Sequence, residues 1–313
     1  MKKTNRDYLK LFENIYLIKD IYWKFIEINT FLIISCGEAA LIDTGIRMMG
    51  KKILKVFNHF CSLQKAFQLK YIIITHAHND HMGSVRVLKE KTKALVACHL
   101  LDVPWLEDIN LQFKETFCRF TPPSKEKKED FDKVVEGNVR CDIILRDKDV
   151  LEVGELKLII IHSPGHTPGS ISIYVPELKV LFTGDNLQWT HEFIRIGHLG
   201  LLTDAISYYK TLRKLQQINA SYILPGHFSI ISGKKINETF ALCFKQYNKF
   251  EEELRMILRS RSLTLKEIKN EIISRINAHA DEDSELCTTY AFLNKLLQEG
   301  KVIKKEEWYL TQE

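Results

Sequence analysis

Three histidines and one aspartate stand close together in the segment His76-Ala77-His78-Asn79-Asp80-His81. Such groups lose their hydration on burial, and this cost is tolerated only where a binding partner offsets it. Imidazole nitrogens and a carboxylate form a ligand set that suits zinc. The segment therefore predicts a metal site and not a packing cluster. The isolated histidines are interpreted as ordinary residues, namely His59, His99, His191 and His279.

Three later segments share one design, in which a glycine or Pro-Gly turn sets a ligand-type residue at the end of an apolar run. They are His162-Ser163-Pro164-Gly165-His166 after the run 156–161, Thr183-Gly184-Asp185 at the end of 180–183, and Pro225-Gly226-His227 after 222–224. The histidine cluster likewise follows the run 71–75. Short apolar runs are typical of buried strands. Four strand ends of the same design predict one shared site.

Taken in order, the motifs H-x-H-x-D-H-x-G, P-G-H-T-P-G, T-G-D and P-G-H resemble the metallo-β-lactamase superfamily over roughly residues 26–227. Residues 29–33 and 41–45 resemble the hairpin that opens the domain of this family. The resemblance implies a mixed α/β fold, the αββα sandwich, with the site at one edge of two packed sheets.

The resemblance also implies a role for each ligand. It implies a first metal held by His76, His78 and His166, a second held by Asp80, His81 and His227, and a bridging carboxylate at Asp185. Asp43 matches a position behind the ligands that orients the ligand loop. His162 either serves in the same way or is a simple turn residue.

Such a site predicts hydrolysis. Two metals ~3.5–4 Å apart can bridge a water molecule and lower its pKa towards ~7, which yields metal-bound hydroxide. We expect Asp80 and Asp185 to be catalytic, with Asp80 orienting the hydroxide and passing a proton to the leaving group. The expected cofactor is two Zn²⁺, although iron and manganese bind the same ligands. Thioesters, esters, lactones and phosphodiesters all remain candidate substrates.

Two residues differ from those found in particular branches of the superfamily, and these differences reduce the number of candidate reactions. Asp185 disfavours a true β-lactamase, and His78 stands where the diiron flavoproteins carry a glutamate. A mononuclear iron persulfide dioxygenase shares several of these motifs and is one alternative. A single-stranded RNA endoribonuclease is another. The expected partners are a small ester or thioester, or RNA.

Mixed strands and helices must position these residues, and this mixture is typical of layered α/β architecture. The predicted strands are 26–34, 39–42, 71–75, 94–97, 156–161, 170–175, 180–183 and 222–224, and the helices are 50–60, 82–90 and 204–218. We assign residues 1–236 to a catalytic domain. Residues 102–140 interrupt the alternation of strands and helices, and they are either a solvated insertion or a lid with aromatic residues facing the substrate.

Residues 237–313 are predicted to form a second, helical, winged-helix-like domain. Helices are expected at 244–260, with an N-cap at Ser262 or Thr264 for 264–276, and at 285–298, followed by a ribbon of 301–303 and 308–310. The segment 293–302 resembles the domain appended to lactamase-β-like hydrolases, some of which cleave single-stranded RNA. Residues 249–313 contain eleven Lys/Arg and thirteen Asp/Glu, a net charge of about −2, which disfavours binding to duplex DNA. A nucleic-acid-binding module is the non-enzyme alternative, and this segment could also form a homodimer contact.

Composition agrees with an ordinary globular protein. Of 313 residues, 45% are hydrophobic and 27% charged, with a net charge of +5. Seven scattered cysteines favour free thiols in a reducing compartment. No secretory apolar region follows residues 1–8, and no apolar run approaches the ~20 residues that span a bilayer. We therefore expect a cytoplasmic protein without a membrane partner.

Overall fold

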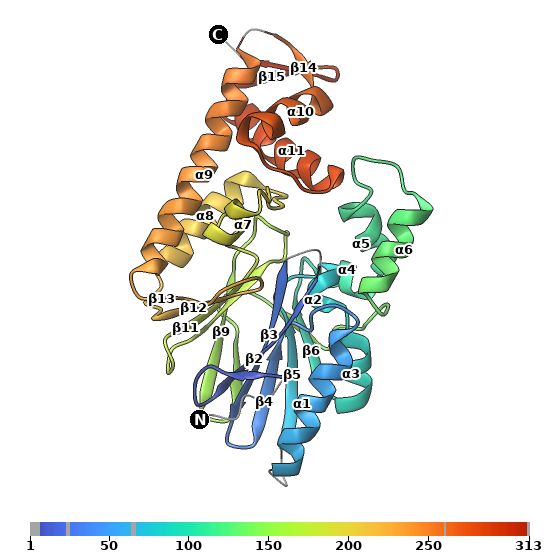
Figure 1. Cartoon of the computed structure of the whole chain (residues 1–313), viewed down its shortest axis with the longest axis vertical. Coiled ribbons are helices and arrows are strands. Elements are labelled where there is room, and N and C mark those ends of the chain that lie inside the picture. Colours follow the sequence, from blue (N-terminus) through green and yellow to red (C-terminus); the bar gives the residue numbers. More distant parts are fainter. Residues whose placement is uncertain (1–6, 23–25, 64–66, 260, 312–313) are drawn as a thin grey trace.

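Two β-sheets pack face to face in the computed structural model, which describes residues 7–22, 26–63, 67–259 and 261–311. Helices lie on both outer faces of this pair (Figure 1). The predicted αββα sandwich is confirmed. Residues 1–6, whose charge entered the prediction about secretion, lie outside the described residues, as does residue 260 at the end of one predicted helix.

The first sheet combines antiparallel hairpins with a parallel half. In spatial order its strands are β1 (Leu9–Lys10), β2 (Ile15–Ile21), β3 (Glu27–Ser35), β4 (Glu38–Ile42), β5 (Gln68–Ile74), β6 (Leu95–His99) and β7 (Ile143–Leu145). The strands from β4 to β7 run parallel, so their carboxyl ends meet at one edge. The helices α1 (Met49–Leu63) and α3 (Val85–Thr92) cover its outer face, while α2 (Asn79–Met82) lies in the ligand loop.

The second sheet has the order β13-β12-β11-β10-β9-β8. Its strands are β8 (Val150–Val153), β9 (Leu156–His162), β10 (Ile171–Val175), β11 (Val180–Gly184), β12 (Tyr222–Pro225) and β13 (Ile231–Ser232). The helix α8 (Ala205–Gln216) and the first half of α9 (Lys235–Leu258) cover it, and α7 (His191–Arg195) follows the site. Every predicted strand is observed. The strands β1, β2, β7, β8 and β13 of these two sheets were not predicted.

Apolar side chains hold the layers together. Between the sheets, Phe31 of β3 and Phe182 of β11 meet edge to face with ring centroids 5.2 Å apart. A second cluster lies between the first sheet and α1 and α3, and a third lies between the second sheet and α8 and α9. The predicted helix 82–90 is divided at Gly83, because α2 ends at Met82 and α3 begins at Val85.

The insertion 102–140 contains the helices α4 (Val103–Glu107), α5 (Ile109–Thr116) and α6 (Lys125–Val134). Phe113, Phe117 and Phe131 pack on one another, with centroids 5.2–6.3 Å apart. Phe117 also lines the cavity at the site. The aromatic residues of this insertion therefore stabilise it internally and in part face the site.

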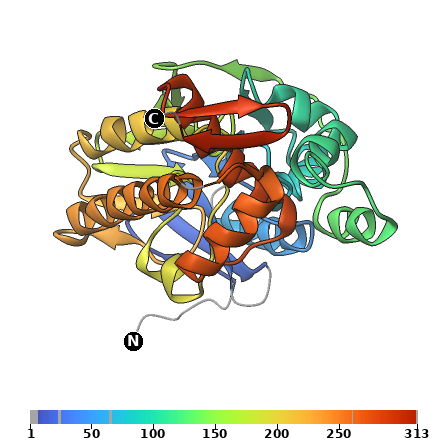
Figure 2. The ribbon, with the colours of Figure 1, turned by 90° about the horizontal axis from the view of Figure 1, so that it is seen from above.

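Beyond α9 the chain forms β14 (Leu263–Thr264), α10 (Leu265–Ile276), α11 (Glu282–Gln298), β15 (Val302–Lys305) and β16 (Trp308–Thr311). The strands make a small sheet of order β14-β16-β15 above the helices (Figure 2). Thr264 is the N-cap of α10 and forms a capping box with Glu267. The helix predicted at 244–260 begins earlier, at Lys235. The winged-helix assignment and the boundary at residue 237 stay predictions.

Across the described part of the chain, no helix is both long enough and apolar enough to span a membrane.

Candidate metal centre

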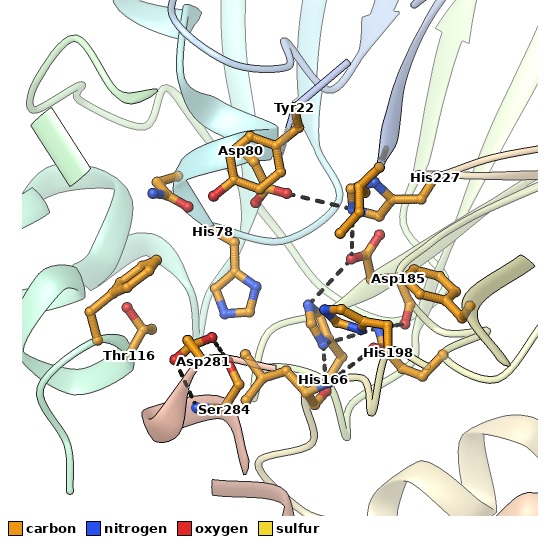
Figure 3. A pocket seen from close by; sticks show the side chains of 16 residues that line it. Tyr22, His78, Asp80, Thr116, His166, Asp185, His198, His227, Asp281 and Ser284 are labelled. Atoms are coloured by element: carbon orange, nitrogen blue, oxygen red, sulfur yellow. Dashed lines mark hydrogen bonds and ion pairs between the residues drawn. The ribbon is translucent and has the colours of Figure 1, made fainter. Parts of the chain in front are cut away.

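The seven side chains that the sequence marks as ligands lie together at one edge of the sandwich. Figure 3 shows five of them, namely His78, Asp80, His166, Asp185 and His227. They form three overlapping groups whose ligand atoms lie within 4.8 Å of one another. These groups are His76, His78 and His166; His76, His81 and Asp185; and Asp80, His81 and His227. The first ligand loop follows β5, and the other residues follow β9, β11 and β12. Ligands from both sheets therefore converge as expected.

Hydrogen bonds at Nδ1 orient four of the five imidazole rings. His81 binds Asp43 at 2.9 Å, His166 binds the Leu201 carbonyl at 2.7 Å, His227 binds the Glu27 carbonyl at 2.8 Å, and His76 contacts the Thr75 hydroxyl at 3.1 Å. Carboxylate and carbonyl oxygens only accept, so the Nδ1 atoms of His81, His166 and His227 carry the protons. In each neutral ring Nε2 is then a bare acceptor, which is the form that binds a metal.

Bare nitrogens face one another at the centre of the site. Nε2 of His76 lies 3.1 Å from Nε2 of His166, and Nε2 of His81 lies 3.3 Å from Nε2 of His227. Two acceptors at this distance repel unless a cation lies between them. Two nitrogens bound tetrahedrally to zinc at ~2.0–2.1 Å stand about 3.3 Å apart. The buried Nε2 of His78 has no hydrogen-bond partner among the described residues. The donor set thus fits divalent ions.

Asp185 occupies a position between the two groups of imidazoles. Its Oδ1 lies 3.4 Å from Nε2 of His81, and its Oδ2 lies 3.2 Å from Nε2 of His227 and 3.7 Å from Nε2 of His166. Gly226 makes this approach feasible, because a Cβ there would lie 2.5 Å from Oδ1 of Asp185. The turn before His227 therefore requires glycine.

Asp43 stands behind the ligands, as predicted. It adopts φ = 57°, a left-handed conformation that is uncommon for a residue other than glycine. One carboxylate oxygen accepts from the Thr75 amide at 2.7 Å, and the other accepts from the Thr75 hydroxyl and from His81. Asp43 thus fixes both the end of β5 and the ring of His81.

The pKa values of the ligand imidazoles are shifted in opposite directions. Burial and the neighbouring rings hold the pKa of His76 and His78 well below the usual value. Burial acts in the same sense on His81, but the carboxylates of Asp185, Asp80 and Asp43 outweigh it and raise the pKa of His81. Burial alone would raise the pKa of Asp185, yet His227 and His81 hold it well below the usual value. The Asp185 carboxylate is therefore ionised and available to a cation.

Asp102 is a buried carboxylate that stands in none of the sequence motifs. It accepts hydrogen bonds from the Ala77 amide at 2.9 Å, the Thr167 hydroxyl at 2.7 Å and the Gly169 amide at 2.6 Å. It therefore connects the loop of His76 and His78 with the loop of His166. Its only local signal is its place shortly after a predicted strand.

A cavity of about 130 Å³ opens beside the ligands. Its polar wall includes Tyr22 and His198, and its apolar wall consists of Ile26, Phe117, Phe193 and Leu201. Burial and the nearby Asp80 raise the pKa of Tyr22. Burial lowers the pKa of His198 to about 4. These residues lie in loops without motifs, so no local pattern marked them.

His162 and His99 stack on each other with centroids 4.0 Å apart, outside the three ligand groups. Nε2 of His162 lies 2.9 Å from the Pro168 carbonyl, so His162 braces the loop that carries His166. His59 of α1 packs beside Tyr8 and Phe60 and belongs to none of the three ligand groups.

Comparisons with known proteins agree with this geometry. The protein named "Probable metallo-hydrolase YqgX" of Bacillus subtilis is 28% identical over 52% of this chain and 67% of its own length. Human "Acyl-coenzyme A thioesterase MBLAC2" is 25% identical over 66% of this chain and 75% of its own length. A relative from Aquifex aeolicus is 31% identical over 48% of this chain and 60% of its own length.

The crystal structure of metallo-beta-lactamase family protein TTHA1429 from Thermus thermophilus shares the fold. It superposes with a TM-score of 0.77 over 97% of this chain and all of its own, at 22% identity. The family model for the metallo-beta-lactamase superfamily matches residues 23–227, which contain all seven clustered His and Asp side chains. The chain therefore belongs to the metallo-β-lactamase superfamily.

Proposed function

We propose that this chain is a dinuclear metal-dependent hydrolase whose substrates are acyl thioesters. The observation that carries the proposal is the cavity beside the ligands, which is small and has an apolar wall of Ile26, Phe117, Phe193 and Leu201. Such a wall accommodates an acyl group next to the reacting carbonyl. The carboxylate-bearing residue Asp281 also lines this cavity. This charge opposes the approach of a polyanionic RNA backbone.

The ligand roles follow the three groups of side chains. In this proposal His76, His78 and His166 would hold the first metal, Asp80, His81 and His227 would hold the second, and Asp185 would be available to both. The imidazole-rich donor set favours zinc. Two bound divalent ions would supply hydroxide at neutral pH and polarise the scissile carbonyl.

The residues of the chain orient the substrate and move the proton. The thioester carbon–sulfur bond breaks as a carbon–oxygen bond to water forms, and the departing thiolate takes up a proton. Asp80 lines the cavity and is positioned to accept the proton of the attacking water and to deliver it to the sulfur. Tyr22 stays protonated because its pKa is raised, so its hydroxyl can donate a hydrogen bond to the carbonyl oxygen.

Two other observations support a thioester over other acyl compounds. The relative MBLAC2 bears the name acyl-coenzyme A thioesterase and aligns over 66% of this chain. In addition, all seven cysteines are free, which supports a reducing compartment, where thiols and their esters persist.

The test is thiol release from acyl thioesters by metal-loaded protein. Acetyl, hexanoyl and palmitoyl thioesters of coenzyme A and of glutathione are assayed beside a labelled single-stranded RNA. We expect thiol release that is lost in Asp80→Ala and retained in Asp130→Ala. Asp130 is a suitable control because its side chain is 76% exposed and pairs with Lys133.

RNA cleavage that disappears in Asp80→Ala, without any thiol release, would refute the proposal in favour of an endoribonuclease. Oxygen consumption with a persulfide substrate would instead indicate the dioxygenase alternative.

A further inference from the structure

A second cavity, of about 400 Å³, lies next to the one at the ligands. Its lining residues are Trp105, Lys114, Glu115, Cys118, Arg119, Pro168 and Thr203. The same three segments wall both cavities. Residues 114–119, 166–168 and 201–203 contribute Thr116, His166 and Leu201 to the first cavity and Lys114, Pro168 and Thr203 to the second. The two cavities are therefore neighbouring parts of one cleft.

The second cavity is fixed relative to the ligands. Trp105 stacks on the ligand-type residue His78, with centroids 6.0 Å apart and an interplanar angle of 15°. The buried amide of Gln112 in α5 donates to the Ala77 carbonyl at 2.7 Å, between His76 and His78. Lys114 thus belongs to a helix that is anchored on the ligand loop.

Positive charge distinguishes this cavity from the first. Lys114 and Arg119 are exposed, and within the described residues neither has a carboxylate partner. The carboxylate of Glu115 is occupied by the Trp105 indole, which donates to it at 2.6 Å. The Arg119 guanidinium lies 5.5 Å from the Phe120 ring and 5.9 Å from the Tyr290 ring. This stacking, together with a contact of 4.0 Å from Nη1 to Sγ of Cys287, holds the guanidinium in place and leaves its other N–H groups available.

From this arrangement we infer that the second cavity binds the phosphorylated half of a large thiol leaving group, through Lys114 and Arg119. The inference rests on the proposed thioester hydrolysis, because the acyl group occupies the apolar cavity at the ligands. A lysine and an arginine at one cavity form charge-assisted hydrogen bonds to phosphate oxygens. The thiol arm would run past Pro168 and Thr203, which border the loop of His166 and the segment of Leu201.

Calorimetric binding to the metal-loaded protein tests this inference without turnover. The probes are coenzyme A, which carries phosphates on its thiol arm, and pantetheine, which has the same thiol arm without phosphates. We expect coenzyme A to bind more tightly than pantetheine. Lys114→Gln and Arg119→Gln should each weaken coenzyme A binding by about tenfold and leave pantetheine unchanged, because each removes one charge-assisted contact. Lys125→Gln is the control, since that lysine is 85% exposed and lies in α6 of the same insertion.

Equal binding of the two probes, or variants that weaken both probes alike, would overturn the inference. Binding of a short single-stranded RNA that is lost in these variants, while coenzyme A binding is unaffected, would overturn it too, because the phosphates would then belong to RNA. If coenzyme A binds as expected but no thioester is hydrolysed, the proposed function fails and the phosphate subsite stands.

Discussion

The ligand clusters and the outer wall of the cleft are built in different ways. Around the ligands, buried hydrogen bonds fix four of the five imidazole rings, and the carboxylates of Asp43 and Asp102 fix the ligand loops. The outer wall of the cleft instead combines three segments that are distant in the sequence, namely the insertion 102–140, residues 200–202 and α11. Asp283 of α11 accepts from the Phe120 and Thr121 amides and pairs with Lys127 at 2.7 Å, and Thr288 of α11 contacts Leu202 and Gly200.

This difference indicates that the first region serves metal binding and the second serves substrate binding. The ligand loops hold charge in a rigid, buried frame, which a metal site requires. The helix α11 supports the insertion and the segment 200–202, and both contribute residues to the cleft. Changes in the first region should affect metal and turnover, whereas changes in the second should affect substrate affinity.

The largest effect is expected from Asp185→Ala. Loss of the carboxylate between the two groups removes a shared ligand and leaves His81 and His227 without their anionic neighbour. Turnover should fall by about 10³-fold or more, as for other losses of charge-stabilising groups at a reaction centre. Steady-state thiol release with metal-loaded protein measures this effect. A variant that folds, as shown by circular dichroism, and keeps more than a tenth of the activity would contradict the role.

Asp102→Asn should disturb the ligand region without removing a ligand. The amide cannot accept all three hydrogen bonds from Ala77, Thr167 and Gly169 with the same strength. We expect about 10–100-fold weaker metal binding, as for other partners of metal ligands. The free energy of unfolding should fall by about 1–3 kcal/mol. Competition with a chromogenic chelator and a urea titration measure the two quantities. Unchanged metal affinity would show that Asp102 serves folding alone.

Asp283→Asn should weaken the outer wall and spare the metals. The variant loses the ion pair with Lys127, so the insertion should be held less tightly. We expect stability to fall by about 1–2 kcal/mol and KM for thioesters to rise with metal content unchanged. Limited proteolysis of residues 117–125 should accelerate, with Asp130→Asn as the exposed control. A loss of metal in Asp283→Asn would break the separation between the two regions.

The smallest effect concerns pH and the stacked pair of His99 and His162. Burial, followed by the charge of His162, lowers the pKa of His99 to about 4. The unfolded chain protonates this ring near pH 6.5, so the folded state binds fewer protons between pH 6.5 and about 4 and loses stability as pH falls through that window. As the pH is lowered from 6.5 to about 4, the free energy of unfolding of His99→Phe should therefore fall by about 1 kcal/mol less than that of the parent protein. If the free energies of unfolding of the parent and the variant change equally with pH across this range, the lowered pKa of His99 is contradicted.

The sequence predicted the ligand region well, because each ligand stands in a short motif after an apolar run. All seven ligand-type residues and Asp43 are found together, and the sandwich fold is confirmed. The sequence did not reveal Asp102, Tyr22, His198 or the cation pair of Lys114 and Arg119. These residues lie in helices and loops whose proximity depends on tertiary packing between the insertion and α11. No local period or motif records such a contact.

Metal analysis of protein purified without added metal tests the dinuclear site most directly. We expect two equivalents of zinc in the parent protein and about one in His227→Ala, because His227 belongs to only one of the three ligand groups. One equivalent of iron in the parent protein, or a metal content unchanged by His227→Ala, would contradict the dinuclear site.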